Sequence, residues 1–151
     1  MEIRQAKIQD VDAIYSLINY YAELDRMLFR QKADIYENLQ SFMVAHEQGQ
    51  VVGCCSLQII WKDLAEIKSL AVHQDYKGKG IGRELVFKAV EKAKLLGVPK
   101  VMALTLEKDF FGKIGFKLVD KEQLPMKVWS DCAKCSKQAH CDEIAFLIEL
   151  N

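Results

Sequence analysis

Three elements follow one another in Glu66-Ile-Lys-Ser-Leu-Ala-Val-His-Gln-Asp-Tyr-Lys-Gly-Lys-Gly-Ile-Gly-Arg-Glu-Leu-Val86. Residues 66–72 are mostly apolar and predict a buried strand, although three polar side chains interrupt them. From Ile81 onward, apolar residues recur at the spacing of a helix. Between the two, three glycines within five residues would let the backbone approach a ligand closely, because glycine has no Cβ. The segment therefore predicts a strand, a glycine-rich loop and a helix.

This loop has the features of an anion site, most naturally one for phosphate. A helix that begins directly after it offers unpaired N–H groups and the positive end of the helix dipole. Lys77, Lys79 and Arg83 add positive charge. A P-loop is excluded because no Lys-Ser or Lys-Thr follows a glycine at the required spacing, and the dinucleotide fingerprint lacks its third glycine. A tight turn with incidental lysines is the alternative, but three glycines exceed what a turn needs.

The run Lys77-Gly78-Lys79-Gly80-Ile81-Gly82 resembles the acetyl-CoA pyrophosphate loop of the GNAT acetyltransferase superfamily, Arg/Gln-x-x-Gly-x-Gly/Ala. Lys77 stands where the superfamily usually has Arg or Gln. The resemblance implies an α/β fold with a mixed, mostly antiparallel central sheet, flanked by helices and splayed at the acetyl-CoA strand. It also implies that acetyl-CoA is a co-substrate. The implied contacts to it are Leu70, Ala71, Val72, Lys77, Gly78, Lys79, Gly80, Ile81, Gly82, Arg83 and Phe111.

Composition limits the class of protein. The chain has 151 residues, half of them apolar, so a disordered chain is excluded and one domain with a real core is expected. Lys plus Arg and Asp plus Glu both number 21, which favours neither a general nucleic-acid binder nor a membrane-surface protein. The first residues lack the apolar core of a signal peptide, and five cysteines fit a reducing compartment, so a cytoplasmic location is expected.

The rest of the chain alternates expected strands and helices, which indicates a mixed α/β sheet. This order resembles that of the superfamily over nearly the whole length, which implies a single acetyltransferase domain over residues 1–151. Strands are expected at 2–6, 42–47, 51–61, 66–72, 100–106, 116–120 and 144–150. Helices are expected after the candidate caps Asp10, Asp34 and Asp109, and from Ile81 to near Gly97. The first of these helices carries its apolar residues, from Val11 to Tyr21, on one face. Residues 48–50 are expected to form a hairpin turn, and Cys54 and Cys55 are expected in the core.

A late element, Phe110-Phe-Gly-Lys-Ile-Gly-Phe116, resembles a superfamily motif whose second position is usually Tyr. In many relatives that Tyr protonates the departing CoA thiolate. Phe111 cannot do so, and the role is therefore absent, moved to another group or filled by water. Phe111 could instead pack against the pantetheine arm or in the core, whereas core packing is favoured for Phe116.

The chain more narrowly resembles short, standalone amino-acid N-acetyltransferases of the N-acetylglutamate synthase type. This resemblance implies acetyl transfer to the α-amino group of glutamate, the first step of arginine biosynthesis. Phe29 departs from the Pro or Val that is common before Arg30 in relatives. The segments that carry the resemblance are 26–30, 36–39, 61–66, 124–129 and 131–143.

Glu66 is the candidate general base. An amino acid's ammonium group is not a nucleophile, so a carboxylate beside the acetyl group must take a proton, directly or through water. Glu66 matches the position where the superfamily often carries that base, and a polar residue in an apolar strand needs an explanation. The alternative is a strand-end glutamate that faces solvent. By the same resemblance, a main-chain amide near Leu70 polarises the thioester carbonyl.

A glutamate substrate brings two carboxylates and requires cations. Arg30 is the best candidate for a bidentate clamp. Lys68 shares a strand face with Glu66, and Lys127 is a third candidate. The alternative for each is a solvated surface charge.

Several alternatives stay open. Cys132, Cys135 and Cys141 could hold zinc, but buried reduced thiols are favoured because a second ligand pair is missing. The acceptor could be another amino acid, a polyamine or a protein lysine, and a non-catalytic acetyl-CoA-binding module is a further alternative. A small-molecule amino acid is the expected partner, with neither nucleic acid nor membrane. A homodimer stays open because dimers are common among relatives.

Overall fold

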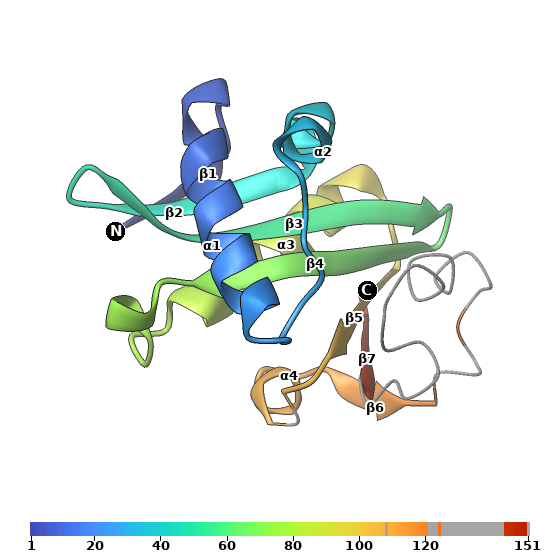
Figure 1. Ribbon diagram of the computed structural model, residues 1–151. Coiled ribbons are helices and arrows are strands. Elements are labelled where there is room, and N and C mark those ends of the chain that lie inside the picture. Colours follow the sequence, from blue (N-terminus) through green and yellow to red (C-terminus); the bar gives the residue numbers. More distant parts are fainter. Residues whose placement is uncertain (108, 121–123, 125–143, 151) are drawn as a thin grey trace. The chain divides into compact units, whose positions relative to one another are not determined.

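The computed structural model describes residues 1–107, 109–120, 124 and 144–150 (Figure 1). The chain divides into two compact units. The first comprises Met1–Gln58 and Ile67–Lys92, and the second comprises Ile59–Glu66 and Ala93–Asn151. The expectation of one domain over residues 1–151 stays a prediction. None of the described helices is long and apolar enough to cross a membrane.

The first unit contains β1, β2 and most of β3 and β4, in the order β1-β2-β3-β4, whereas the end of β3 and the start of β4, within Ile59–Glu66, belong to the second unit. β1 and β2 pair antiparallel, as do β2 and β3, with an irregularity between Ala45 and His46. The His73 N–H donates to the Val52 carbonyl oxygen (2.8 Å) and joins β3 to the residue just after β4. These strands are β1 (Glu2–Gln5), β2 (Phe42–Glu47), β3 (Gln50–Trp61) and β4 (Leu64–Val72).

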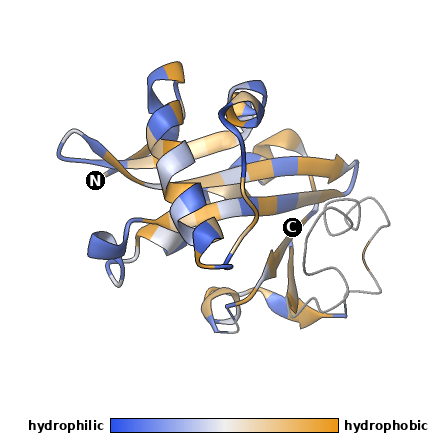
Figure 2. Cartoon of the chain, in the orientation of Figure 1, coloured by the Kyte–Doolittle hydropathy of each residue, from blue (hydrophilic) through white to orange (hydrophobic). Residues whose placement is uncertain are grey.

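Two helices cover the two faces of this part of the sheet. α1 (Val11–Glu23) buries its predicted apolar face in a core with Phe42, Val44 and Cys54, and Figure 2 shows apolar and polar positions alternating along it. α3 (Ile81–Leu96) packs on the other face at Gly53, where an added Cβ would lie 3.1 Å from Leu85 Cδ1. Neighbouring residues of a strand point to opposite faces of the sheet, so Gly53 faces α3 and Cys54 faces α1.

None of the three expected aspartates caps its helix through its side chain, and Asp109 stands at the cap position of the helix Phe110–Lys113 without a side-chain cap hydrogen bond. α2 spans Lys32–Glu37, so Asp34 lies inside the helix instead of before it, and that prediction is wrong. The reason is that the Asp34 carboxylate binds Arg30 and Asn38, which leaves Gln31 at the cap position. Asp10 does precede α1, but its carboxylate accepts the Lys7 N–H (2.8 Å) across a short 3-10 turn instead of capping α1.

The second unit contains the strand order β5-β7-β6, with both pairs antiparallel. Every strand pair whose register is described above is therefore antiparallel, and the expected mostly antiparallel sheet with flanking helices is confirmed. A core of Ile60, Leu64, Met102 and Ala145 holds this unit together. The elements that lie wholly in this unit are β5 (Lys100–Thr105), α4 (Phe110–Lys113), β6 (Lys117–Val119) and β7 (Ile144–Glu149).

Candidate functional site

The glycine loop joins the end of β4 to the start of α3. Gly78 and Gly80 have φ angles of +80° and +81°, a left-handed conformation that L side chains rarely adopt. The Gly80 carbonyl oxygen accepts the first helical N–H, from Glu84 (3.1 Å), so Gly80 is the residue that immediately precedes α3. The N–H groups of the first helical turn then have no partner within the helix. This geometry fits the predicted anion site.

The three cations of the loop each lie over an aromatic ring. The Lys77 Nζ lies 4.7 Å from the centre of the Tyr21 ring, and the Lys79 Nζ lies 5.1 Å from the centre of the Tyr76 ring. The Arg83 Cζ lies 5.2 Å from the centre of the Phe87 ring. All three cationic side chains are exposed at the helix start. They add positive charge where the helix dipole is already positive.

Strand β4 departs from regular geometry at Ser69, whose φ is +54°. Left-handed backbone at a residue other than glycine costs about 1–3 kcal/mol and persists only where its surroundings hold it. Here the Ser69 carbonyl oxygen accepts from the Cys54 thiol (3.4 Å), and its Oγ accepts from Arg30 Nη1 (3.3 Å). The turn at Ser69 changes the direction of the next main-chain amide, that of Leu70. This amide is the one predicted to polarise the thioester.

The residues after Ser69 lead directly into the loop. Leu70 and Val72 are half-buried, whereas Ala71 is buried. The Val72 carbonyl oxygen accepts a hydrogen bond from the Tyr21 hydroxyl. The structure therefore places all predicted main-chain contacts on one continuous segment, from β4 through the loop to α3. Their contact with acetyl-CoA stays a prediction.

Glu66 is only 5% exposed in β4. A solvent-facing strand-end glutamate, the alternative interpretation of this residue, is therefore wrong. Burial of a carboxylate is costly and usually serves either a structural network or a function. Lys68 follows two residues later on the same strand and is half-buried. The roles of both residues stay predictions.

Arg30 is held firmly, but by a carboxylate of the protein itself. Its Nε and Nη2 donate to the two Asp34 oxygens at 2.7 and 3.2 Å. Its guanidinium also lies 5.0 Å from the centre of the Phe42 ring. The Asn19 amide pairs with both main-chain groups of Arg30. The fork predicted for a substrate carboxylate is therefore filled by Asp34, and Nη1 faces Ser69.

The Arg30–Asp34 pair predicts a pH dependence of stability. The hydrogen bond from Arg30 lowers the pKa of the Asp34 carboxyl, although partial burial opposes this shift. Because its pKa is lowered in the folded state, the ionised carboxylate stabilises the fold at any pH above its ordinary pKa. This stabilisation is lost as the pH falls through the pKa of the folded state. Asp34→Asn should therefore lower the unfolding free energy by about 0.5–1 kcal/mol at pH 7, a size limited by solvent screening.

Urea unfolding of the wild type and Asp34→Asn between pH 2.5 and 7 would measure this contribution. The difference between the two proteins should be constant above about pH 5 and shrink below about pH 4. A difference that is the same at every pH would show that Asp34 acts through packing and not through its charge.

Other predicted residues lie elsewhere or outside the described part of the chain. Phe111 is 4% exposed and packs against Phe110, Phe116 and Phe146 in the second unit. This fits core packing, and its contact with the pantetheine arm stays a prediction. Residues outside the described ranges are Lys127, Cys132, Cys135 and Cys141.

The two cysteines in the described part of the chain have unreactive thiols. Cys54 and Cys55 are fully buried, as expected for core residues. Burial raises the pKa of the Cys54 thiol to about 12 and also raises that of Cys55. Their thiols are therefore protonated at neutral pH, which makes them poor nucleophiles and poor metal ligands. Within the described residues, no three His, Cys, Asp or Glu side chains are grouped as a metal site.

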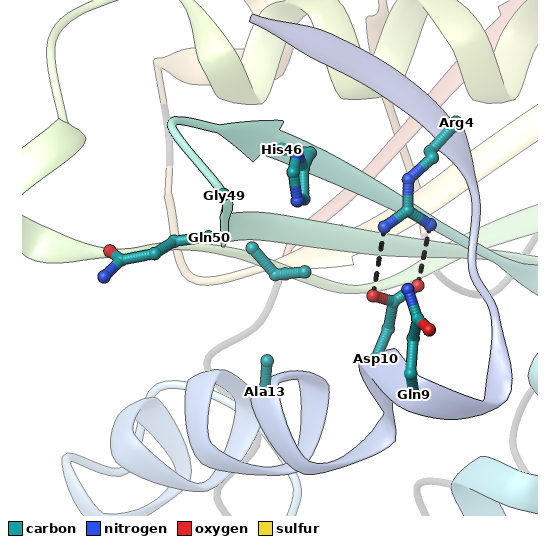
Figure 3. A pocket seen from close by; sticks show the side chains of 8 residues that line it. Arg4, Gln9, Asp10, Ala13, His46, Gly49 and Gln50 are labelled. Atoms are coloured by element: carbon teal, nitrogen blue, oxygen red, sulfur yellow. Dashed lines mark hydrogen bonds and ion pairs between the residues drawn. The ribbon is translucent and has the colours of Figure 1, made fainter.

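A separate hollow of about 520 Å³ lies between the start of α1 and the β2–β3 turn (Figure 3). At its edge Arg4 donates twice to the Asp10 carboxylate, at 2.7 and 3.1 Å. This pair joins β1 to the start of α1. His46 also lines the hollow. None of the predicted site residues does.

The sequence did not reveal three residues of this arrangement: Ser69, Asp34 and Tyr21. Ser69 stood out only as a polar interruption of β4, and Asp34 was interpreted as a cap. Tyr21 was assigned to the apolar face of α1. A signal existed for Tyr21, because a buried tyrosine hydroxyl usually needs a hydrogen-bond partner. A signal existed for Asp34 as well, because Arg30 and Asp34 have the i,i+4 spacing of an ion pair. The contacts of Ser69, in contrast, join segments 15 and 39 residues apart.

Comparison with known proteins places this arrangement in a family context. The model of the acetyltransferase (GNAT) family matches residues 8–116. An uncharacterized N-acetyltransferase of Chlorobaculum tepidum is 43% identical over 145 residues, which are 96% of this chain and 94% of that protein. An amino-acid acetyltransferase of Mycobacterium tuberculosis is 33% identical over 135 residues, which are 87% of this chain and 77% of that protein.

A solved structure shows the same fold. N-acetylglutamate synthase from Neisseria gonorrhoeae, complexed with coenzyme A and N-acetyl-glutamate, superimposes with a TM-score of 0.90 at 24% sequence identity. The match covers 99% of this chain but only 35% of that longer protein. The chain therefore corresponds to about a third of the synthase.

Proposed function

Because the chain belongs to the acetyltransferase (GNAT) family, we propose that it transfers an acetyl group from acetyl-CoA to the α-amino group of L-glutamate. The protein is an N-acetyltransferase related to amino-acid acetyltransferases. The observation that carries the proposal is the continuous segment from β4 to α3. It combines a buried carboxylate, a redirected main-chain amide and a cationic glycine loop at a helix start.

Each part of this segment has a role in the proposed reaction. The glycine loop and the first turn of α3 hold the pyrophosphate of acetyl-CoA. The Leu70 amide donates to the thioester oxygen as negative charge develops there. Glu66 takes one proton from the ammonium group, directly or through water, so that the nitrogen can attack. The new C–N bond replaces the C–S bond, and the second proton that nitrogen loses passes through water to the CoA thiolate, because Phe111 has none to give.

Glutamate as acceptor rests on two supports. The relative from M. tuberculosis is named an amino-acid acetyltransferase, and the N. gonorrhoeae synthase was solved with N-acetyl-glutamate. The chain also offers Arg30, Lys68 and Lys127 as candidate partners for two carboxylates. A role in arginine biosynthesis would follow from this acceptor.

Thiol release from acetyl-CoA, followed with a panel of amino acids, polyamines and lysine peptides, tests the proposal. Glutamate should give the highest kcat/KM. If glutamine or a polyamine reacts equally well, glutamate is the wrong acceptor and only the acetyltransferase activity stands. If acetyl-CoA binds but no acceptor releases thiol, the chain is a non-catalytic acetyl-CoA-binding module.

Because Asp34 occupies Nε and Nη2 of Arg30, a glutamate carboxylate would have to bind at Nη1. Arg30→Ala should then raise the KM for glutamate strongly and leave the KM for acetyl-CoA nearly unchanged. A lost charge-assisted hydrogen bond is worth about 1.5–3 kcal/mol, or roughly a 10- to 150-fold fall in kcat/KM. Arg30→Lys should recover part of it, since a lysine keeps the charge without the fork. Steady-state kinetics at fixed acetyl-CoA would measure both variants.

The structure also provides a control for this experiment and an alternative role for Arg30. Lys32→Ala removes a nearby cation whose Nζ pairs with Asp12 at 3.1 Å, and it should leave the glutamate KM unchanged. If Arg30→Ala lowers kcat without changing that KM, Arg30 acts through Ser69 instead of through the substrate.

A further inference from the structure

Tyr21 contacts both ends of the segment that connects β4 to the glycine loop. Its hydroxyl donates to the Val72 carbonyl oxygen at the end of β4. Its ring lies 4.7 Å from the Nζ of Lys77, the first residue of the loop. We propose that Tyr21 is the positioning residue for acetyl-CoA binding, because it fixes Val72 and Lys77 together. This inference rests on the cofactor site of the proposed function.

Tyr21 itself is well anchored. It is 6% exposed and belongs to the same core as Ile14, Ile18 and Phe42. Because its ring is immobilised by this packing, its hydroxyl and its ring face stay where α1 places them. A lysine side chain has four flexible carbons, so an unrestrained ammonium group would sample many positions. The Tyr21 ring restricts Lys77 before any ligand arrives.

A second tyrosine supports the same segment. The hydroxyl of Tyr20, the neighbouring residue of α1, donates to the Gln74 Oε1 at 2.7 Å. The two tyrosine rings meet edge to face, with their centres 5.0 Å apart. Three contacts from the end of α1 therefore reach Val72, Gln74 and Lys77.

The consequence for binding is pre-organisation. A loop held in its binding conformation loses less conformational entropy when a ligand binds, and this gain appears in affinity. Tyr21 touches neither reacting atoms nor acceptor in this proposal. Its loss should therefore weaken acetyl-CoA binding without changing turnover at saturation.

Isothermal calorimetry with CoA and steady-state kinetics with acetyl-CoA test this role. Tyr21→Phe removes the hydroxyl and keeps the ring, and should raise the Kd for CoA about three- to tenfold. Tyr21→Leu removes both and should raise it roughly two- to fivefold further. The KM for acetyl-CoA should follow the Kd, while kcat stays within about twofold of the wild type.

A double-mutant cycle distinguishes positioning from packing. In the wild-type background, Tyr21→Leu should bind CoA more weakly than Tyr21→Phe. In a Lys77→Met background this difference in Kd should disappear, because no ammonium group is left for the ring to hold. A purely structural role would give the same difference in both backgrounds. Circular dichroism checks folding, and Tyr21→Phe still tests the hydroxyl if Tyr21→Leu does not fold.

Tyr15 and Lys32 provide a matched control. The Lys32 Nζ, from α2, lies 5.2 Å from the centre of the Tyr15 ring. Tyr15 lies on α1, as Tyr21 does, but nearer the start of that helix. Tyr15→Leu should leave the Kd for CoA unchanged. Wild-type binding of CoA by both Tyr21 variants would overturn the inference. If the wild type itself does not bind CoA, the proposed function fails instead.

Discussion

Replacement of Glu66 by Gln should lower turnover at pH 7 by about 10² or more while the affinity for acetyl-CoA stays nearly unchanged. Glutamine keeps the shape of the side chain and loses the proton acceptor. Because Glu66 is 5% exposed, bulk water cannot simply replace it beside the strand. Kinetics at saturating acetyl-CoA, with the CoA affinity measured separately, would show this split between kcat and binding.

The pH dependence of the variant makes the test sharper. The activity of Glu66→Gln should rise toward that of the wild type at high pH, where the acceptor amine loses its proton unaided. Glu91→Gln removes a carboxylate on α3 that pairs with Lys88 at 3.5 Å, and it should behave like the wild type. Near-normal turnover of Glu66→Gln at pH 7 would assign the proton to another group or to a water chain.

Gly82→Asp should weaken acetyl-CoA binding by roughly 10²-fold in a folded protein. The new carboxylate at position 82 would repel the negatively charged pyrophosphate. Two charges about 4 Å apart interact by about 1 kcal/mol in water and by about 4 kcal/mol near a protein surface. Gly82 lies in the first turn of α3 with a helical backbone, so its backbone conformation does not require glycine. Acidic residues even stabilise a helix start.

Gly82→Asn is the matched control, since it has nearly the same size and no charge. Calorimetry should place its CoA affinity between those of the wild type and Gly82→Asp, which separates charge from bulk. Unchanged affinity in a folded Gly82→Asp protein would remove the cofactor assignment from this loop.

Local patterns in the sequence predicted most of the fold. The apolar periodicity of residues 11–21 identified the buried face of α1, and Gln48-Gly49-Gln50 identified the β2–β3 turn. The segment 66–86 gave the strand, the loop and the helix in the right order. These features depend on residues that are close in the chain, and a pattern of neighbours is what a single sequence displays.

Contacts between distant residues escaped prediction. Arg30 and Ser69 are 39 residues apart, and Tyr21 and Val72 are 51 apart. The Arg30–Asp34 pair was missed for a different reason: the two residues are only four apart, but an aspartate near a helix start also looks like a cap. The loop cations were predicted, but not the aromatic rings beneath them.

The left-handed backbone of Ser69 constrains which residues can replace it during evolution. β-Branched residues such as Val and Ile usually favour strands, but they tolerate a positive φ worst. The usual strand preference is therefore inverted at position 69. Gly, Asn and Asp are the residues that can replace Ser there, and the best strand formers are disfavoured. A comparison of related chains that weighs substitutions by ordinary strand propensity would misjudge this single position.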